Sequence, residues 1–211
     1  MKEFNIVNIS IYEDTILNLS NQYREKIYKN ILLGTENHFK NDYEDVPFVM
    51  SDGLKFLFDK IKISVEETYS DREVQRIEYW GHLHEKNMST QDHAHFDSEA
   101  FNRGEDWLSG VFFLKVPEGS GKITFLFSKN PHSREMFDVL CEYSPKNNIV
   151  LIFPTWLIHR VTRNKSEDHR VSIGFNILLR EKQGVKYLPE YTTIQTAAHS
   201  LQRGQHDSIN S

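Results

Sequence analysis

The second half of the chain is a succession of short apolar segments, and this feature restricts the possible folds more than any other. From about residue 74 these segments follow one another, each bounded by Gly, Pro, Asn or Ser: VQRIEYWGHLHE, LSGVFFLKV, GKITFLF, NNIVLIF and HRVSIGFNILL. Runs of this length, rich in β-branched and aromatic residues, are typical of β-strands. Few helical signals separate them, so the pattern predicts a mainly β protein, a sandwich or a barrel.

Two amphipathic segments precede the strands. Residues 14–33 have apolar side chains near helical spacing and end at Gly34, and residues 54–69 show a similar periodicity. We therefore expect residues 1–73 to form a helical layer packed on a β-barrel of residues 74–180. Residues 181–211 lose the pattern, and we expect them to form a C-terminal arm whose last dozen residues are mobile.

The composition excludes several classes of function. A chain of 211 residues with a net charge of −5 has no excess of basic residues, so we expect no nucleic-acid partner. The single Cys141 excludes an internal disulfide and a Cys-rich zinc site. The first residues, MKEFNIVNIS, contain no signal-peptide core, and no apolar run approaches the length of a membrane span. These observations favour a cytoplasmic protein that has no membrane partner.

The segment HAHFD offers three candidate metal ligands, His93, His95 and Asp97. On a strand, alternate residues point the same way, so any two neighbours of this set can bind one ion. A third ligand, His159, follows the distant apolar strand in FPTWLIHRV. Three ligands on one side leave the other positions of a non-haem Fe(II) ion open for a cosubstrate and dioxygen. The spacing does not decide whether His93 or Asp97 accompanies His95.

Arg170 and Ser172 open the strand that follows His159 and lie two positions apart. On that strand they share one face. A guanidinium group pointing into a barrel needs an anionic partner, and its planar fork fits a carboxylate. Alternatively, Arg170 is a surface residue of the strand. The combination with His159 favours carboxylate binding.

A second alternating pair, His82 and His84, occurs in WGHLHE and shares a strand face with Trp80. These side chains either line a pocket or form the polar outer face of a sheet. Other histidines lie in polar or loop-like contexts, where a surface position is the simplest interpretation; they are His38, His132, His169, His199 and His206.

Four segments together resemble a known family: HAHFDS, LSGVFFLKVPEGSGKITF, IVLIFPTWLIHRV and RVSIGFN. The chain is similar over residues 76–179 to the 2-oxoglutarate- and Fe(II)-dependent oxygenases of bacteria and their phages. The resemblance implies a double-stranded β-helix, a jelly-roll or cupin-like barrel. It implies that His159 is the distal iron ligand and that Arg170 with Ser172 binds the far carboxylate of 2-oxoglutarate. The expected reaction is hydroxylation of a C–H bond, with release of succinate and CO2.

The resemblance leaves open which residue accompanies His95 as a metal ligand and what the substrate is. The wider superfamily uses H-x-D, which selects His95 and Asp97, whereas the nearer family aligns with HAHFDS and selects His93 and His95. In the second case Asp97 is free to orient a histidine as a hydrogen-bond acceptor. The stretch EAFNRGEDW resembles an insertion, expected to form a loop at the barrel mouth, so the substrate is unknown, a small molecule or a protein side chain.

Two other functions compete with this interpretation. A cupin-like metal enzyme that does not use 2-oxoglutarate would also suit three histidines, but it would leave Arg170 and Ser172 without a role. A non-catalytic jelly-roll binding module is the second alternative. The presence of a candidate for every ligand argues against it.

Overall fold

The computed structural model describes residues 1–6, 9–16, 19–37, 45–46, 49–95, 97–128, 137–182 and 190–193. The helices are α1 (Asn21–Asn37), α2 (Asp52–Thr68) and α3 (Ser98–Asn102). The strands, in chain order, are β1 (Lys2–Ile6), β2 (Ile9–Thr15), β3 (Asp45–Val46), β4 (Arg72–His84), β5 (Asp106–Lys115), β6 (Ile123–Ser128), β7 (Phe137–Tyr143), β8 (Ile149–Pro154), β9 (His159–Val161), β10 (Arg170–Glu181) and β11 (Glu190–Thr193).

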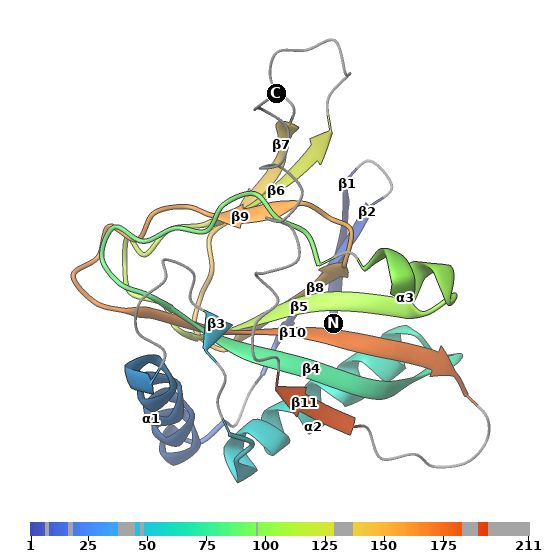
Figure 1. Ribbon diagram of the computed structural model, residues 1–211, viewed down its shortest axis with the longest axis horizontal. Helices are drawn as coiled ribbons and strands as arrows, with labels where there is room; N and C mark the ends of the chain where they lie inside the picture. The colour runs from blue at the N-terminus through green and yellow to red at the C-terminus, as the bar shows by residue number, and fades with distance from the viewer. Residues whose placement is uncertain are drawn as a thin grey trace, which may run out of the picture.

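The strands form two sheets, which Figure 1 shows one above the other. The large sheet has the order β1-β2-β8-β5-β10-β4-β11, with β3 beside β4, and the small sheet has the order β7-β6-β9. Among the strands that the structure describes, antiparallel pairing dominates, and β11 alone runs parallel to its neighbour β4. Two facing antiparallel sheets built from strands of one barrel segment are the jelly-roll arrangement expected from the sequence.

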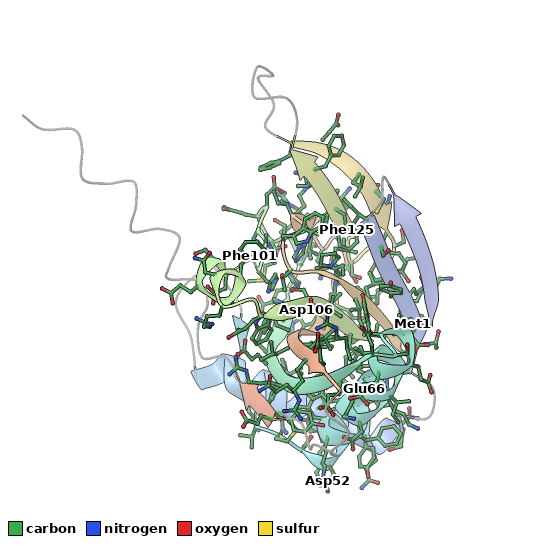
Figure 2. The ribbon with its side chains drawn as sticks, turned by 90° about the vertical axis from the view of Figure 1, so that its right-hand side faces the viewer. Met1, Asp52, Glu66, Phe101, Asp106 and Phe125 are labelled. Atoms are coloured by element: carbon green, nitrogen blue, oxygen red, sulfur yellow. The ribbon has the colours of Figure 1, made fainter. Side chains whose placement is uncertain are left out.

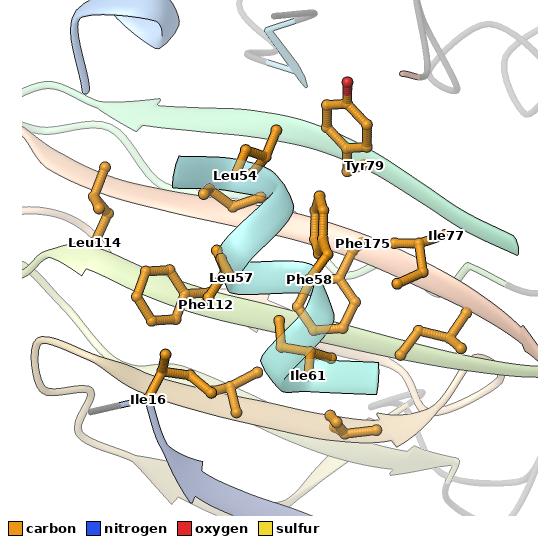
Figure 3. Packing of buried hydrophobic residues seen from close by; sticks show 14 of the residues in the cluster. Ile16, Leu54, Leu57, Phe58, Ile61, Ile77, Tyr79, Phe112, Leu114 and Phe175 are labelled. Carbon is orange, nitrogen blue, oxygen red and sulfur yellow. The ribbon is translucent and has the colours of Figure 1, made fainter. Parts of the chain in front are cut away.

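Helices α1 and α2 cover the outer face of the large sheet, as Figure 3 shows for α2. Ser51 caps α2 by accepting a hydrogen bond from the backbone N–H of Leu54. The buried positions of α2 recur every three or four residues, and Phe58 meets Phe175 of β10 edge to face at 6.0 Å. This apolar layer stabilises the large sheet from its outer side.

A second apolar cluster lies between the sheets. It contains Val111 and Phe113 of β5 and Phe153 of β8 from the large sheet, and Ile123 and Phe125 of β6 from the small one. Figure 2, turned by 90°, shows Phe125 in the upper part of the molecule and Glu66 of α2 in the lower part. Because side chains alternate along a strand, the large sheet contributes residues to two separate cores, one against the helices and one between the sheets.

The structure differs from the sequence prediction at the N-terminus. Residues 2–15 are not part of a helical layer, because β1 and β2 form a hairpin whose second strand pairs with β8. The first helix begins at Asn21 rather than near residue 14, and it continues past Gly34. At Asp14 and Thr15, tertiary pairing with β8 outweighs the helical spacing of the sequence.

Two further elements were not predicted. Strand β7 has no buried residue, so its sequence FDVLCEY carries little of the apolar signal of a strand. The stretch expected to be a loop, residues 99–107, contains most of α3 and the start of β5. In the C-terminal arm, residues 190–193 form β11 beside β4, whereas the residues predicted to be mobile lie outside the described part of the chain. No described helix is long and apolar enough to cross a membrane.

Candidate metal centre

His93, His95 and His159 meet between the two sheets. One nitrogen from each imidazole lies within 4.8 Å of those of the other two. The ring centroids are 4.3 Å apart for His93 and His159 and 5.2 Å apart for each pair that includes His95. Three neutral nitrogen donors converging on one point are a donor set for a divalent metal such as iron, zinc or nickel.

Backbone pairing explains why these histidines converge. The N–H of His93 donates to the carbonyl of His159 at 3.0 Å, and the N–H of His159 donates back at 2.9 Å. The two residues are therefore directly opposite each other, as in an antiparallel ladder. The N–H of His95 donates to the carbonyl of Thr155 at 2.9 Å, which extends the pairing along the same edge.

Hydrogen bonds also set the ring orientation of two candidate ligands. Nδ1 of His93 lies 2.8 Å from the carbonyl oxygen of Gln91, and Nδ1 of His159 lies 2.9 Å from that of Leu157. Since a carbonyl oxygen only accepts, each Nδ1 carries the proton, and Nε2 keeps its lone pair for a metal. Burial, followed by the charge of His93, lowers the pKa of His159 to about 3. The ring is therefore neutral and able to bind a cation.

The carboxylate of Asp97 has a different role in the structure. Asp97 is the N-cap of α3, where its Oδ1 accepts hydrogen bonds from the backbone N–H groups of Glu99 at 2.8 Å and Ala100 at 3.3 Å. This interaction stabilises the first turn of a short helix. Among the described residues, the group able to hold a metal contains the three histidines and not Asp97.

Arg170 and Ser172 lie at the start of β10, on its inner face, and are almost completely buried. The guanidinium of Arg170 lies over the ring of Phe113, 5.3 Å from its centroid. Its Nε and Nη1 have no hydrogen-bond partner among the residues that the structure describes. Burial lowers the pKa of Arg170 only to about 10, so the side chain stays charged at neutral pH. A buried cation with free donors is a site for an anion.

One cavity connects the two sets of residues. It is lined by the three histidines, by Arg170 and Ser172, and by apolar side chains of both sheets, including Phe153 and Ile123. The donor set of the histidines fits iron, and the free N–H groups of Arg170 fit a carboxylate of 2-oxoglutarate. The residues present therefore suit both groups.

The alternating residues of β4 also line this cavity, which decides between the two interpretations of His82 and His84. The indole N–H of Trp80 donates to Nε2 of His82 at 2.7 Å. The same indole ring stacks on His95, with centroids 5.1 Å apart and an interplanar angle of 23°. Trp80 thus connects the β4 row with a candidate metal ligand.

Two residues of the site were missed by the sequence reasoning. Gly174 lies beneath Trp80, and a Cβ at this position would come within 2.6 Å of the indole ring. Asn164 is fully buried, and its side-chain amide donates hydrogen bonds to the carbonyl of His84, the last residue of β4, and to that of Asp168, which precedes Arg170. The glycine in RVSIGFN was a visible signal, since glycine inside a strand often marks a close approach. The Asn164 contacts have no local signature.

Comparison with known proteins identifies what the barrel is similar to. Residues 78–176 match the model of a family described as "Putative 2OG-Fe(II) oxygenase". No curated protein matches the chain.

Solved structures with the same fold are numerous although their sequences are distant. A prolyl-4-hydroxylase of Pseudomonas putida is 11% identical with a TM-score of 0.51, and covers 82% of this chain and 88% of its own. The viral collagen prolyl hydroxylase of Paramecium Bursaria Chlorella virus-1, in a 2OG complex, is 14% identical with a TM-score of 0.53, covering 81% and 97%. The alpha ketoglutarate dependent carbocyclase SnoK from nogalamycin biosynthesis is 12% identical with a TM-score of 0.53, covering 83% of each chain.

Proposed function

We propose that this chain, a 2OG-Fe(II) oxygenase through residues 78–176, hydroxylates a C–H bond of its substrate at an iron ion bound by His93, His95 and His159. The observation that carries the proposal is the single cavity shared by three convergent imidazoles and a buried arginine with free donors. The oxygenase core is residues 74–180, with residues 1–73 packed on it and residues 181–211 as an arm.

The three histidines hold the metal on one side and leave the rest of its coordination sphere open. When bound, iron and 2-oxoglutarate supply the activation of dioxygen, with succinate and CO2 as co-products. The hydrogen bonds from Nδ1 of His93 and His159 to backbone carbonyls keep both rings in the binding orientation before the metal arrives. The apolar side chains around the cavity, such as Phe153, keep water away from the site.

Arg170 and Ser172 bind the far carboxylate of the cosubstrate. The charge of Arg170 compensates the carboxylate in a place where neither group is hydrated, and the two free N–H groups supply directed hydrogen bonds. This pairing accounts for a buried guanidinium that would otherwise be costly. A cupin-like enzyme that does not use 2-oxoglutarate would leave this arginine without a partner, and so would a binding module without a reaction.

The substrate is a small molecule or a protein side chain. The solved structures of this fold include both kinds by name, collagen prolyl hydroxylase and a carbocyclase of nogalamycin biosynthesis. With a net charge of −5 and a single cysteine, we further propose that the protein acts in the cytoplasm and has no nucleic-acid partner.

Succinate formation and cosubstrate binding test the proposal. The iron-loaded protein, incubated with 2-oxoglutarate, ascorbate and air, is expected to release succinate slowly even without its substrate. Arg170→Ala should lose 2-oxoglutarate binding by calorimetry at least 100-fold, because it removes the positive charge that compensates the carboxylate in the cavity, and should keep its iron. His159→Ala should lose the iron. The absence of both succinate and 2-oxoglutarate binding in the wild-type protein would contradict the function, and loss of iron from Arg170→Ala would make Arg170 structural.

A further inference from the structure

His84, the last residue of β4, is a buried polar residue to which the proposed function gives no role. Its exposed fraction is only 2%. Its Nδ1 has no hydrogen-bond partner among the residues that the structure describes. Buried polar atoms in native proteins are nearly always hydrogen-bonded, so an atom without a partner points to a ligand or a bound water.

The strand register places His84 next to Arg170. The two residues are direct partners in the antiparallel pairing of β4 with β10, and both line the candidate cavity. Direct partners project from the same face of a sheet, with Cβ atoms about 5 Å apart. The free atoms of His84 and Arg170 therefore belong to one end of the cavity, next to Ser172.

The charge states of the two side chains are compatible with a shared anion. Burial, followed by the charges of His82 and Arg170, lowers the pKa of His84 to about 2. The imidazole is thus neutral at physiological pH and carries one N–H, while Arg170 carries the positive charge. A neutral donor beside a cation adds a hydrogen bond to a carboxylate without adding repulsion between the two residues.

A hydrogen bond to its backbone fixes the position of His84. Its backbone carbonyl accepts a hydrogen bond at 2.9 Å from the amide of Asn164, which also donates at 2.9 Å to the carbonyl of Asp168, two residues before Arg170. One amide group therefore holds the end of β4 and the start of β10 at a constant separation. A preorganised pair of donors is what carboxylate recognition in a dry cavity requires.

We infer that His84 is a further cosubstrate-binding residue, which donates its Nδ1–H to the same carboxylate that Arg170 and Ser172 bind. The inference rests on the proposed function, because it takes 2-oxoglutarate as the source of that carboxylate. The role is one of binding and selection: His84 distinguishes a 2-oxo dicarboxylate from a 2-oxo acid that lacks the second carboxylate.

Calorimetric titrations of the protein loaded with Zn(II) test the inference without turnover. The ligands are 2-oxoglutarate and 2-oxopentanoate, which has the same chain without the far carboxylate. His84→Leu is expected to bind 2-oxoglutarate at least 10-fold more weakly than the wild type and to bind 2-oxopentanoate equally. His84→Asn keeps an N–H near the position of Nδ1 and should stay within about 3-fold of the wild type for both ligands. His169→Leu, next to Arg170 but outside the cavity lining, is the matched control and should change neither affinity.

Each result separates the inference from the proposed function. If His84→Leu binds 2-oxoglutarate as tightly as the wild type, or loses both ligands by the same factor, His84 does not bind the far carboxylate. If the wild type binds no 2-oxoglutarate, the proposed function itself fails. Should His84→Leu not fold, the 15N-labelled wild type gives the answer by NMR. The Nδ1–H signal of His84 should shift with 2-oxoglutarate and not with 2-oxopentanoate, and an equal shift with both, or none with either, contradicts the inference.

Discussion

At the scale of single residues, the choice of metal ligands depends on which side chains already form hydrogen bonds elsewhere. The alignment with the nearer family favoured His93 over Asp97 as the ligand that accompanies His95, and the surroundings of the two residues differ. The carboxylate of Asp97 accepts two backbone N–H groups at the start of α3. His93 donates from Nδ1 to a carbonyl and so presents Nε2 toward the other two rings. We therefore expect the metal to be bound by three neutral ligands, without a carboxylate to reduce its charge.

Substitutions of Asp97 distinguish a helix-capping role of its carboxylate from a metal-binding role. Asn caps helices about as well as Asp, so Asp97→Asn should keep both the iron and the stability of the protein. Asp97→Ala should keep the iron and lose about 1 kcal/mol of stability. His93→Ala should lose most of the iron, because one of three ligands is missing. Iron content by absorption spectroscopy and urea unfolding measure the two effects. Iron lost from Asp97→Asn but retained by His93→Ala would select the His95, Asp97 and His159 set.

At the scale of elements, the sequence predicts what has a local pattern and misses what depends on distant partners. Segments around β5, β8 and β10 were predicted because their apolar runs are buried between a helix layer and a facing sheet, and the segment around β6 because its apolar side chains are buried between the two sheets. Strand β7, which has no buried residue, and the N-terminal hairpin carry weaker patterns, and the hairpin joins the large sheet through the pairing of β2 with β8.

The same division holds in the candidate site. The resemblance predicted the oxygenase class and the need for iron and 2-oxoglutarate, and the family match confirms these predictions. The spacing of His93 and His95 and the R-x-S pattern identified the candidate ligands. The positions of Trp80 and Gly174 follow from the register of β4 against β10, which no single segment encodes.

The junction between β4 and β10 depends most on Asn164. Its amide nitrogen donates to the carbonyls of His84 and Asp168, and its Oδ1 accepts from the backbone N–H of Ser166 at 2.9 Å. The side chain is completely buried, and so is its bond to the carbonyl of His84, so water cannot replace that bond after a substitution.

We predict that Asn164→Ala weakens both stability and cosubstrate binding. The free energy of unfolding should fall by about 2–3 kcal/mol, because the buried carbonyl of His84 loses its partner and the part-buried Asp168 carbonyl and Ser166 N–H each lose a hydrogen bond. The affinity for 2-oxoglutarate should fall several-fold, since the start of β10 is no longer fixed relative to β4. Urea unfolding and calorimetry measure these changes. Ser166→Ala removes only a hydroxyl that accepts from the Asp168 N–H at 3.1 Å near the surface, and it should change little. Equal effects of both substitutions would show that Asn164 has no special role.

At the scale of the whole molecule, the large sheet has an apolar layer on its outer face, whereas its inner face carries both a smaller apolar cluster and the polar side chains of the candidate site. The outer layer, between the large sheet and helices α1 and α2, contains buried Leu, Ile, Val and aromatic side chains and supplies most of the hydrophobic stabilisation. The inner space instead holds histidines and an arginine, which cost free energy to bury. The outer face of the large sheet thus contributes to stability alone, whereas the inner face combines an apolar cluster with the candidate site.

This arrangement predicts that the metal-free protein is sensitive to mild acid. Burial lowers the pKa of His84 to about 2 and that of His82 to about 3, whereas both titrate near 6.5 in the unfolded chain. Below pH 6.5 the unfolded chain therefore binds protons that the folded protein cannot, so the free energy of unfolding falls as the pH falls. At pH 5 the expected loss is about 2 kcal/mol for each histidine.

A comparison of the wild type with the His84→Asn variant separates the contribution of His84 from those of other titrating groups. Glu78, whose pKa is raised by burial, acts with the opposite sign, because the folded protein then binds a proton more readily than the unfolded chain. His84→Asn leaves Glu78 unchanged and removes one imidazole from the cavity. Between pH 7.5 and pH 5, urea unfolding of the metal-free His84→Asn variant should therefore show a loss about 2 kcal/mol smaller than that of the wild type. Equal losses in the two proteins would mean that the folded protein protonates His84 at pH 5, and that the cavity is open enough to solvent to hydrate an imidazolium beside Arg170.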